Sequence, residues 1–244
     1  MTASVWITGA GSGIGAALAQ RLAATGNDVV ASGRRPQPLA ALAALPPGRI
    51  RSMAVDVTDR DAVARTVTAM GPVDMAILCA GDHRPTPAQA FDAETVRHLL
   101  EVNLMGTVHC VEALLPSMLE RGRGHLVLVA SVAGYRGLPT AAGYSASKAG
   151  VIALAESLRL DLAGSGVRVT LVNPGFVDTP LTQRNSFAMP DIISPAAAAD
   201  HVLRGLDGNG FEIAFPRRFA LAMKLLRILP DRVYFPLVRK VTGC

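Results

Sequence analysis

The chain has 244 residues, of which 50% are hydrophobic and 18% are charged. This length and composition suit one large domain with a sizeable core and exclude an intrinsically disordered chain. The net charge of the chain is +5, and residues 216–240 alone carry seven basic side chains and one acidic one. The rest of the chain is therefore near −1. A uniformly basic groove for nucleic acid is not expected.

Short β-branched runs alternate with segments rich in alanine and leucine along most of the chain. The expected strands are 3–8, 28–33, 50–55, 73–79, 125–130, 167–172 and 211–215. The expected helices are 14–25, 36–45, 59–70, 92–120, 144–164 and 195–207. The strands are apolar nearly throughout, which is typical of strands covered on both faces. The pattern predicts a single-domain α/β fold of the Rossmann type, a doubly wound parallel sheet with helices on both faces.

A glycine-rich loop follows the first expected strand and leads into a helix. The common dinucleotide fingerprint G-x-G-x-x-G does not fit, whereas T-G-x-x-x-G-x-G does, with glycines at 9, 13 and 15. Glycine allows a tight turn and a close approach to phosphate, and the helix N-terminus favours an anion. The loop therefore predicts a pyrophosphate site built from Thr8, Gly9, Gly11, Ser12, Gly13, Ile14 and Gly15.

The ends of the second and third strands bear on the choice of cofactor. Arg34 and Arg35 follow the second strand, where an acidic residue would favour NAD, and an arginine there can pair with the 2′-phosphate of NADP. A solvated arginine pair opening a loop is the alternative. Asp56 and Val57 end the third strand and are expected to contact the adenine edge.

Tyr144 and Lys148 are four residues apart in a helical segment, so both side chains project from one face. A hydride transfer to a carbonyl carbon leaves an oxygen that must collect a proton, and a phenol of pKa about 10 is a poor acid at neutral pH. An ammonium about 5 Å away is expected to lower the pKa of the phenol by roughly two units. The pair therefore predicts a general acid or base.

Two further polar residues complete the candidate catalytic set. Ser131 follows the fifth strand, where its hydroxyl can bind a substrate oxygen, although a serine there is often only a helix cap. Asn103, within the helical stretch 92–120, is a buried polar candidate that could hold a water for proton relay, although such residues often face solvent.

These residues resemble the classical short-chain dehydrogenase/reductase family over about residues 3–215. The matching motifs are Thr8-Gly9…Gly13-Ile14-Gly15, Asp56-Val57, Ala80-Gly81, Asn103, Ser131, Tyr144-x-x-x-Lys148 and Asn173-Pro174-Gly175-Phe176-Val177-x-Thr179. The resemblance implies that Tyr144 is the proton donor, that Ser131 orients the substrate, that Lys148 also binds the nicotinamide ribose and that Asn103 supports the relay. It also implies cofactor contacts from Ala80, Gly81, Pro174, Gly175, Val177 and Thr179, the last two at the carboxamide.

The chain departs from the family pattern after the fourth strand, where Cys79-Ala80-Gly81 replaces Asn-Ala-Gly. The family asparagine ties strands together, so the cysteine is expected to affect local rigidity more than the reaction, and a buried small side chain is favoured over a reactive thiol. Residues 180–194 occupy the place of the family's substrate lid, with Phe187 and Met189 as apolar contacts, which favours a neutral or apolar substrate.

The basic segment 216–240 has two interpretations. Basic side chains beside leucine, phenylalanine and tyrosine at helical spacing are typical of an amphipathic element at an anionic membrane surface. The alternative is a helix that packs across a subunit boundary or over the substrate pocket. We expect residues 1–215 to form the dinucleotide-binding and catalytic domain, with residues 216–244 as a tail of that same domain.

Compartment and metal content follow from weaker signals. The N-terminus lacks a basic region followed by an apolar run, no stretch approaches about 18 uncharged apolar residues, and the three cysteines are widely spaced. We therefore expect a cytoplasmic protein. In the membrane interpretation of the tail, the protein would also contact a membrane surface peripherally. The five histidines are scattered without an H-E-x-x-H pattern, so no metal is expected.

The sequence thus predicts an oxidoreductase that uses NADP(H) in preference to NAD(H) and acts on a small carbonyl or secondary alcohol, apolar or lipid-like. A homo-oligomer, dimer or tetramer, is implied by the resemblance. The rival hypothesis is a dinucleotide-binding sensor or scaffold without turnover, but such proteins are expected to lose the tyrosine or the lysine, and both are present.

Overall fold

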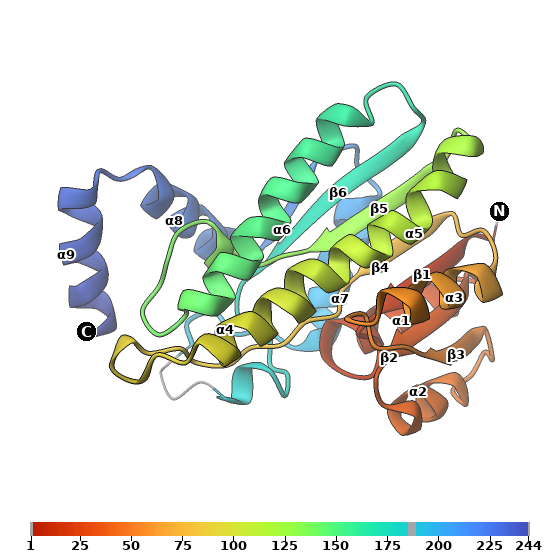
Figure 1. Cartoon of the computed structure of the whole chain (residues 1–244), viewed down its shortest axis with the longest axis horizontal. Helices are drawn as coiled ribbons and strands as arrows, with labels where there is room; N and C mark the ends of the chain where they lie inside the picture. Colours follow the sequence, from red (N-terminus) through yellow and green to blue (C-terminus); the bar gives the residue numbers. More distant parts are fainter. Residues whose placement is uncertain (1, 185–188, 244) are drawn as a thin grey trace.

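A computed structural model describes residues 2–184 and 189–243. Within these residues, seven parallel strands form one sheet between two layers of helices (Figure 1). The strands are β1 (Ser4–Thr8), β2 (Asp28–Gly33), β3 (Ile50–Ala54), β4 (Met75–Leu78), β5 (Gly124–Val129), β6 (Val167–Pro174) and β7 (Glu212–Phe215). The doubly wound parallel sheet predicted from the sequence is confirmed.

The helices follow the strands in regular alternation. They are α1 (Gly13–Ala24), α2 (Pro36–Ala43), α3 (Arg60–Met70), α4 (Ala93–Leu100), α5 (Gly106–Glu120), α6 (Ala142–Asp161), α7 (Pro195–Leu206), α8 (Arg217–Ile228) and α9 (Asp231–Thr242). Short helical turns are η1 (Ala88–Ala90), η2 (Glu101–Met105), η3 (Val132–Gly134) and η4 (Thr182–Arg184).

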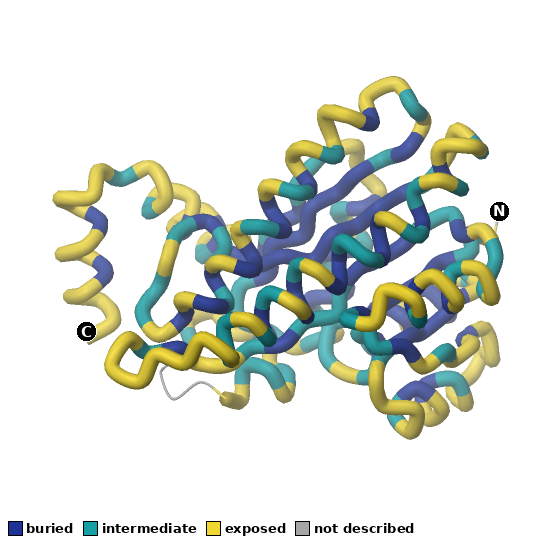
Figure 2. Tube along the Cα trace, viewed as in Figure 1, coloured by how far each residue is buried: buried dark blue, intermediate teal, exposed yellow. Residues whose placement is uncertain are grey.

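Each central strand buries both of its faces, which explains why the strands are apolar throughout. Trp6 of β1 belongs to the core cluster under α3, α5 and α6, whereas its neighbours Val5 and Ile7 belong to the cluster under α1 and α7. The indole N–H of Trp6 donates to Ser32 Oγ at 2.9 Å on β2, so its polar atom is satisfied. Figure 2 shows the resulting buried sheet between exposed outer helical surfaces.

The strand order is β3-β2-β1-β4-β5-β6-β7. Successive strands are added on one side of β1 up to β3 and on the other side from β4 onwards, so the order switches between β1 and β4. Loops that leave neighbouring strands at this point diverge to opposite faces and open a crevice at the carboxyl ends of the strands. The sheet therefore places the segments that follow β1, β4, β5 and β6 around one site.

The expected helix over 92–120 is interrupted. Its middle, η2, is a turn of π-helix between α4 and α5. The wider turn shifts the helix register beside Gly106, where a Cβ would lie 2.5 Å from Val57 Cγ2. By length and composition alone, the run Ala93–Glu120 is apolar enough to cross a membrane, but α4 packs on α6 and α5 on α3, as core helices of globular proteins do.

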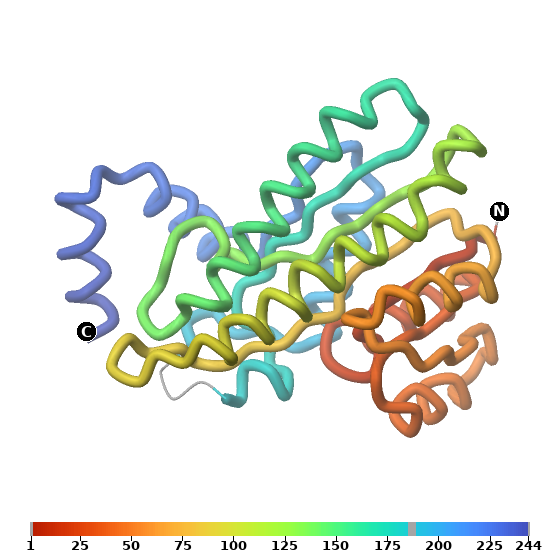
Figure 3. Tube along the Cα trace, in the orientation of Figure 1, coloured from red at the N-terminus to blue at the C-terminus, as the bar shows by residue number. Residues whose placement is uncertain are grey.

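The C-terminal tail forms two helices, joined at Leu229 and Pro230. Ala220 and Met223 of α8 enter the core, and Tyr234 and Val238 of α9 are buried. Arg136 holds the corner: its guanidinium donates to Leu229 O, pairs with Asp231 and stacks 3.7 Å from the Tyr234 ring centroid. The remainder of α9 projects away from the body of the molecule (Figures 1 and 3).

Candidate active site

A cavity of about 680 Å³ opens at the carboxyl ends of the strands. Most of the residues predicted from the sequence line it: Gly9, Gly11, Ser12, Gly13, Ile14, Gly15, Arg34, Arg35, Asp56, Val57, Ala80, Gly81, Ser131, Tyr144, Lys148, Pro174, Gly175, Val177 and Thr179. Thr8 and Asn103 are buried behind its wall. A second cavity of about 420 Å³, between α3 and α5, is lined by none of these residues.

The glycine loop combines two kinds of glycine. Gly9, with φ +69°, lies against the backbone of Ala80, which a Cβ would meet at 2.8 Å, so packing of the protein itself requires it. Around Gly11 the nearest atom to an added Cβ is 3.8 Å away, so packing does not require that glycine. The missing side chain leaves open a cradle on the cavity wall.

The N-terminus of α1 faces this cradle with free capacity for an anion. Ser12 is the N-cap but its side chain makes no capping hydrogen bond, and no acidic residue occupies the first turn. The first N–H groups of a helix and its dipole attract negative charge. The cradle and the helix end together fit the pyrophosphate of a dinucleotide.

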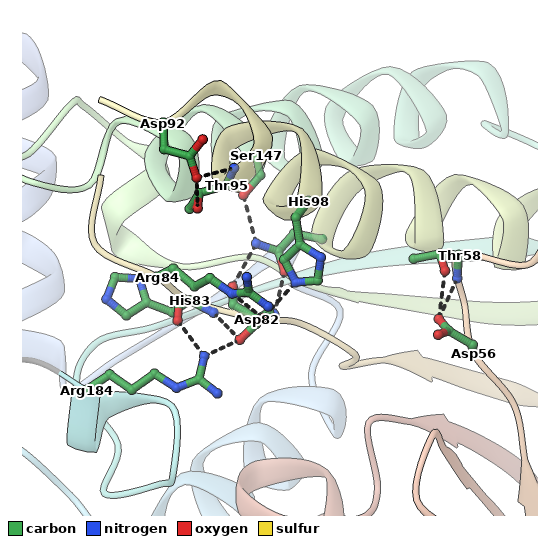
Figure 4. Close-up of polar contacts among 11 residues, drawn as sticks. Asp56, Thr58, Asp82, His83, Arg84, Asp92, Thr95, His98, Ser147 and Arg184 are labelled. Carbon is green, nitrogen blue, oxygen red and sulfur yellow. Dashed lines mark hydrogen bonds and ion pairs between the residues drawn. The ribbon is translucent and has the colours of Figure 1, made fainter. Parts of the chain in front are cut away.

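The two arginines and Asp56 line the cavity after β2 and β3, and Gly33, the residue before Arg34, lies close to Gly11 of the cradle. Arg34 and Arg35 follow β2 and are exposed, and within the described part of the chain neither forms an ion pair. The Asp56 carboxylate accepts hydrogen bonds from the Thr58 N–H at 3.0 Å and the Thr58 hydroxyl at 2.9 Å through one oxygen (Figure 4).

Thr8 contacts the segment that begins at Cys79 through its hydroxyl. Its hydroxyl oxygen accepts hydrogen bonds from the N–H groups of Cys79 and Ala80, both at 3.1 Å, and so ties the end of β1 to the end of β4. Burial raises the pKa of the Cys79 thiol to about 11, so the thiol stays protonated at neutral pH.

Tyr144, Lys148 and Ser131 converge on the cavity from two elements. Tyr144 and Lys148 lie one turn apart on α6, with Lys148 Nζ 5.9 Å from the centroid of the tyrosine ring. Lys148 is buried, and its ammonium donates to Val129 O of β5 at 3.0 Å. Ser131, two residues after β5, lines the same cavity. Its hydroxyl donates to Pro174 O at 3.4 Å and accepts from the Ala133 N–H at 3.1 Å.

The electrostatics of this group differ from the expectation. Burial raises the pKa of Tyr144 to about 12, although the hydrogen bond with Ser131 acts in the opposite direction. Burial also lowers the pKa of Lys148 to about 8. The predicted lowering of the phenol pKa is therefore not found, because burial disfavours the charged phenolate more than the contact with Ser131 favours it.

Asn103 lies in η2 and is fully buried. Its side-chain oxygen accepts from the Asp82 N–H at 2.7 Å, while its amide donates to Asp82 O at 3.0 Å and to Ser147 Oγ at 2.9 Å. Both amide hydrogens are thus directed at protein groups. The side chain links the loop after β4 to α6.

The sequence analysis missed a polar cluster on the cavity wall. Asp82 follows Gly81 and gathers Arg84, His98 and Arg184 around one buried carboxylate (Figure 4). The signal was available, since Asp-His-Arg directly after a parallel strand is placed where ligands bind. The contact to Arg184 spans 102 positions in the sequence, which no local pattern reveals.

Two other sequence expectations concern the lid and metals. Phe187 lies outside the described residues, and Met189 is half-buried. Within residues 2–184 and 189–243, no group of three or more histidine, cysteine or acidic side chains could hold a metal ion.

Comparison with known proteins places this site in a family. The family profile for short chain dehydrogenases matches residues 3–189. An uncharacterized oxidoreductase of Myxococcus xanthus is 38% identical over 242 residues, 96% of each chain. A short chain dehydrogenase from Burkholderia cenocepacia, solved in complex with NADP, is 29% identical with a TM-score of 0.85 over 100% of this chain and 98% of that one. A short-chain dehydrogenase from Streptomyces avermitilis is 25% identical, with a TM-score of 0.83 over 100% and 98% of the two chains.

The profile covers well over half of the chain, and the Myxococcus relative matches nearly all of it. The chain therefore belongs to the short-chain dehydrogenase family of oxidoreductases.

Proposed function

We propose that the protein is an NADP(H)-dependent oxidoreductase that interconverts a carbonyl compound and a secondary alcohol. The observation that carries this proposal is the convergence of Tyr144, Ser131 and Lys148 on the cavity that also contains the glycine cradle. A phenol, a hydroxyl and an ammonium beside a dinucleotide site are the groups that a carbonyl oxygen needs when its carbon is reduced.

The bound nicotinamide cofactor supplies or accepts the hydride. The cradle at Gly11 and the N-terminus of α1 would hold the pyrophosphate, and Asp56, Val57, Ala80 and Gly81, which line the cavity, would contact the adenosine half. Pro174, Gly175, Val177 and Thr179, which also line it, would contact the nicotinamide half. Lys148 would bind the nicotinamide ribose.

Tyr144 donates the proton during reduction and accepts it during oxidation. With a pKa of about 12, the phenol is fully protonated at neutral pH, so reduction begins from the correct protonation state. As the proton leaves, the Lys148 ammonium and the Ser131 hydroxyl stabilise the charge that develops on the phenolic oxygen and the substrate oxygen. Asn103 positions the loop after β4 and α6, and a role in proton relay stays a prediction.

NADP(H) is preferred over NAD(H) in this proposal. Arg34 and Arg35 provide two positive charges at the adenosine end of the cavity, where a 2′-phosphate would lie. The Burkholderia relative was solved with NADP, which supports the same choice.

The substrate, the assembly and the compartment are further parts of the proposal. Leu181 and Pro180 add apolar surface to the cavity, which supports an apolar or lipid-like carbonyl substrate. Exposed Met105 and Leu160, on the face of the molecule that bears η2 and α6, support a homo-oligomer paired through that face. The free thiols of Cys79 and Cys110 support a reducing, cytoplasmic setting.

The experiment is NADPH oxidation with a panel of ketones, aldehydes and lipid-like carbonyls, using Tyr144→Phe as the test variant and Tyr135→Phe as a control outside the cavity. Turnover should fall by about 10²-fold or more in Tyr144→Phe, because general acid catalysis contributes that much, while NADPH still binds. Tight NADPH binding without turnover of any compound would contradict the proposal and favour the sensor hypothesis.

A further inference from the structure

Asp82 is a buried carboxylate at the point where the loop after β4 meets the cavity. Its side chain is 6% exposed. One oxygen accepts from Arg184 Nη1 at 2.6 Å and from the His83 N–H at 2.9 Å. The other contacts His98 Nε2 at 2.8 Å and Arg84 Nε at 3.3 Å (Figure 4). A buried carboxylate needs such partners, and losing one costs far more than losing a surface ion pair.

The backbone around Asp82 is fixed as firmly as its side chain. The Asn103 amide binds the N–H and the C=O of Asp82, and the same amide donates to Ser147, whose hydroxyl donates to Tyr144 O at 2.8 Å. On the other side, the His83 ring meets the Tyr144 ring edge-on, with centroids 4.8 Å apart. Asp82 is therefore tied to the catalytic tyrosine by two routes.

Arg184 connects this fixed point to a segment that lines the cavity, residues 177–184, which we call the strap. At its first end, the Thr182 hydroxyl donates to Val177 O at 2.6 Å, and its oxygen accepts from the Thr179 N–H at 3.0 Å. At its far end, Arg184 Nη1 reaches Asp82 and also donates to His83 O at 2.8 Å.

The strap thus spans from the segment after β6 to the loop after β4. Thr179, Pro180, Leu181, Thr182 and Arg184 all line the cavity. Among the described residues, the hydrogen bonds and ion pairs at the far end of the strap are those of Arg184 with Asp82 and His83. Ile193, further along the chain, hydrogen-bonds Phe176 and Asp178 at the first end of the strap. Arg184 therefore supplies the contact between η4 and the loop after β4.

We propose that Asp82 and Arg184 are positioning residues that anchor the strap across the substrate half of the cavity and thereby set the affinity for the carbonyl substrate. The kinetic part of this inference rests on the proposed function, whereas the anchoring does not. The glycine cradle and Arg34 lie outside the strap, whereas Val177 and Thr179 at its first end also line the cavity, so substrate affinity should depend on this ion pair more than cofactor affinity does.

Hydrogen–deuterium exchange tests the anchoring without any substrate. Asp82→Asn keeps the shape of the side chain and removes its charge, and Arg184→Gln removes the charge at the other end. Each variant should exchange at least tenfold faster in peptides covering residues 177–184, and the double variant should exchange no faster than either single one. The matched control is Glu94→Gln with Arg97→Gln, an exposed ion pair of 3.5 Å on α4, which should leave those peptides unchanged.

Steady-state kinetics with the panel carbonyl that is turned over fastest tests the consequence. Both variants should raise KM about tenfold and keep kcat within threefold. The Kd for NADPH should rise clearly less than KM, because only the first end of the strap, at Val177 and Thr179, is assigned to the cofactor. Arg184→Lys retains a charge but not the planar two-acceptor contact, so it should restore part of the affinity.

Several results would overturn the inference. Unchanged exchange in the strap of a folded Asp82→Asn or Arg184→Gln variant would show that the ion pair anchors nothing. A raised KM with unchanged exchange would assign Arg184 to direct contact with substrate, and an equal loss of NADPH affinity would assign it to the cofactor. If no panel compound reacts but exchange rises tenfold, the proposed function fails while the anchoring stands.

Discussion

At the scale of single residues, Arg34 distinguishes between the two cofactors. It is exposed at the end of β2 and lines the cavity. A charge-assisted hydrogen bond to a 2′-phosphate contributes about 1.5–3 kcal/mol, or roughly 10- to 100-fold in affinity. Arg34→Ala should therefore weaken NADPH binding by that factor and leave NADH binding nearly unchanged, as measured by fluorescence titration.

The control for this prediction is Arg49→Ala, which removes an exposed arginine paired with Asp28 at 2.9 Å, away from the cavity. Equal losses of NADPH and NADH affinity in Arg34→Ala would exclude a 2′-phosphate contact.

The pair Tyr144 and Lys148 shows what a sequence motif leaves open. The spacing of four residues correctly placed both side chains on one face of α6. The motif cannot report that Lys148 is buried and Tyr144 half-buried. Burial favours the neutral form of each group, raising the pKa of the phenol and lowering that of the ammonium. The residue types were predictable from the sequence, and their protonation behaviour depended on packing.

At the scale of elements, the order and type of the strands followed directly from the apolar runs. The strand expected over 28–33 has those bounds in the structure, and the others differ by one or two residues at their ends. The turn η2 could not be predicted in this way, because a π-turn has the composition of the helices on either side of it. The sequence analysis also did not predict the full cluster around Asp82, because side chains from three separate segments form it.

His125 links β5 to β6 through a contact of 2.9 Å from Nε2 to Thr170 Oγ1. Burial lowers its pKa from 6.5 to about 4, aided by the charges of Arg168 and Arg159. In the unfolded chain His125 therefore becomes protonated as the pH falls through 6.5, whereas in the folded chain it becomes protonated only near pH 4. Stability is full above pH 6.5 and falls as the pH drops towards 4, by about 3 kcal/mol.

His125→Gln should remove this part of the pH dependence, because an amide does not titrate. Urea unfolding at pH 7, 5.5 and 4, followed by tryptophan emission, measures the slope in both proteins. Asp82 and Glu212, whose pKa values are lowered despite burial, lose their contribution at more acid pH in both. A slope in His125→Gln that equals the wild-type slope would contradict the assignment.

At the scale of the whole molecule, charge and exposed apolar surface gather on α8 and α9. Leu221, Leu225 and Ile228 are exposed along the outward face of α8, beside Arg217 and Arg218. On α9, Phe235 and Val241 are exposed near Arg239 and Lys240. Two copies meeting through this surface would repel each other, whereas an anionic bilayer would attract it and cover the apolar side chains.

We propose that this surface of α8 and α9 binds anionic membranes, and vesicle sedimentation tests the proposal. The protein should sediment with vesicles that contain phosphatidylserine at low salt, less at high salt, and hardly at all with phosphatidylcholine alone. Replacing Leu225 and Ile228 by serine should reduce binding at all salt concentrations, whereas serine at Leu45, an exposed leucine after α2, should not. If the protein sediments with vesicles under none of these conditions, the membrane interpretation is wrong, and the alternative, that α8 and α9 pack against another subunit, is favoured.

Trp6 is the single tryptophan of the chain, and its dry indole lies in the middle of the sheet, two residues before the strand ends. Indole emission moves to longer wavelength when water reaches the ring, so the colour of that emission measures whether the sheet is intact. A reduced nicotinamide absorbs light in the range where indole emits. The fold therefore contains its own optical reporter, which distinguishes loss of the sheet, a shift in colour, from arrival of the cofactor, a loss of intensity.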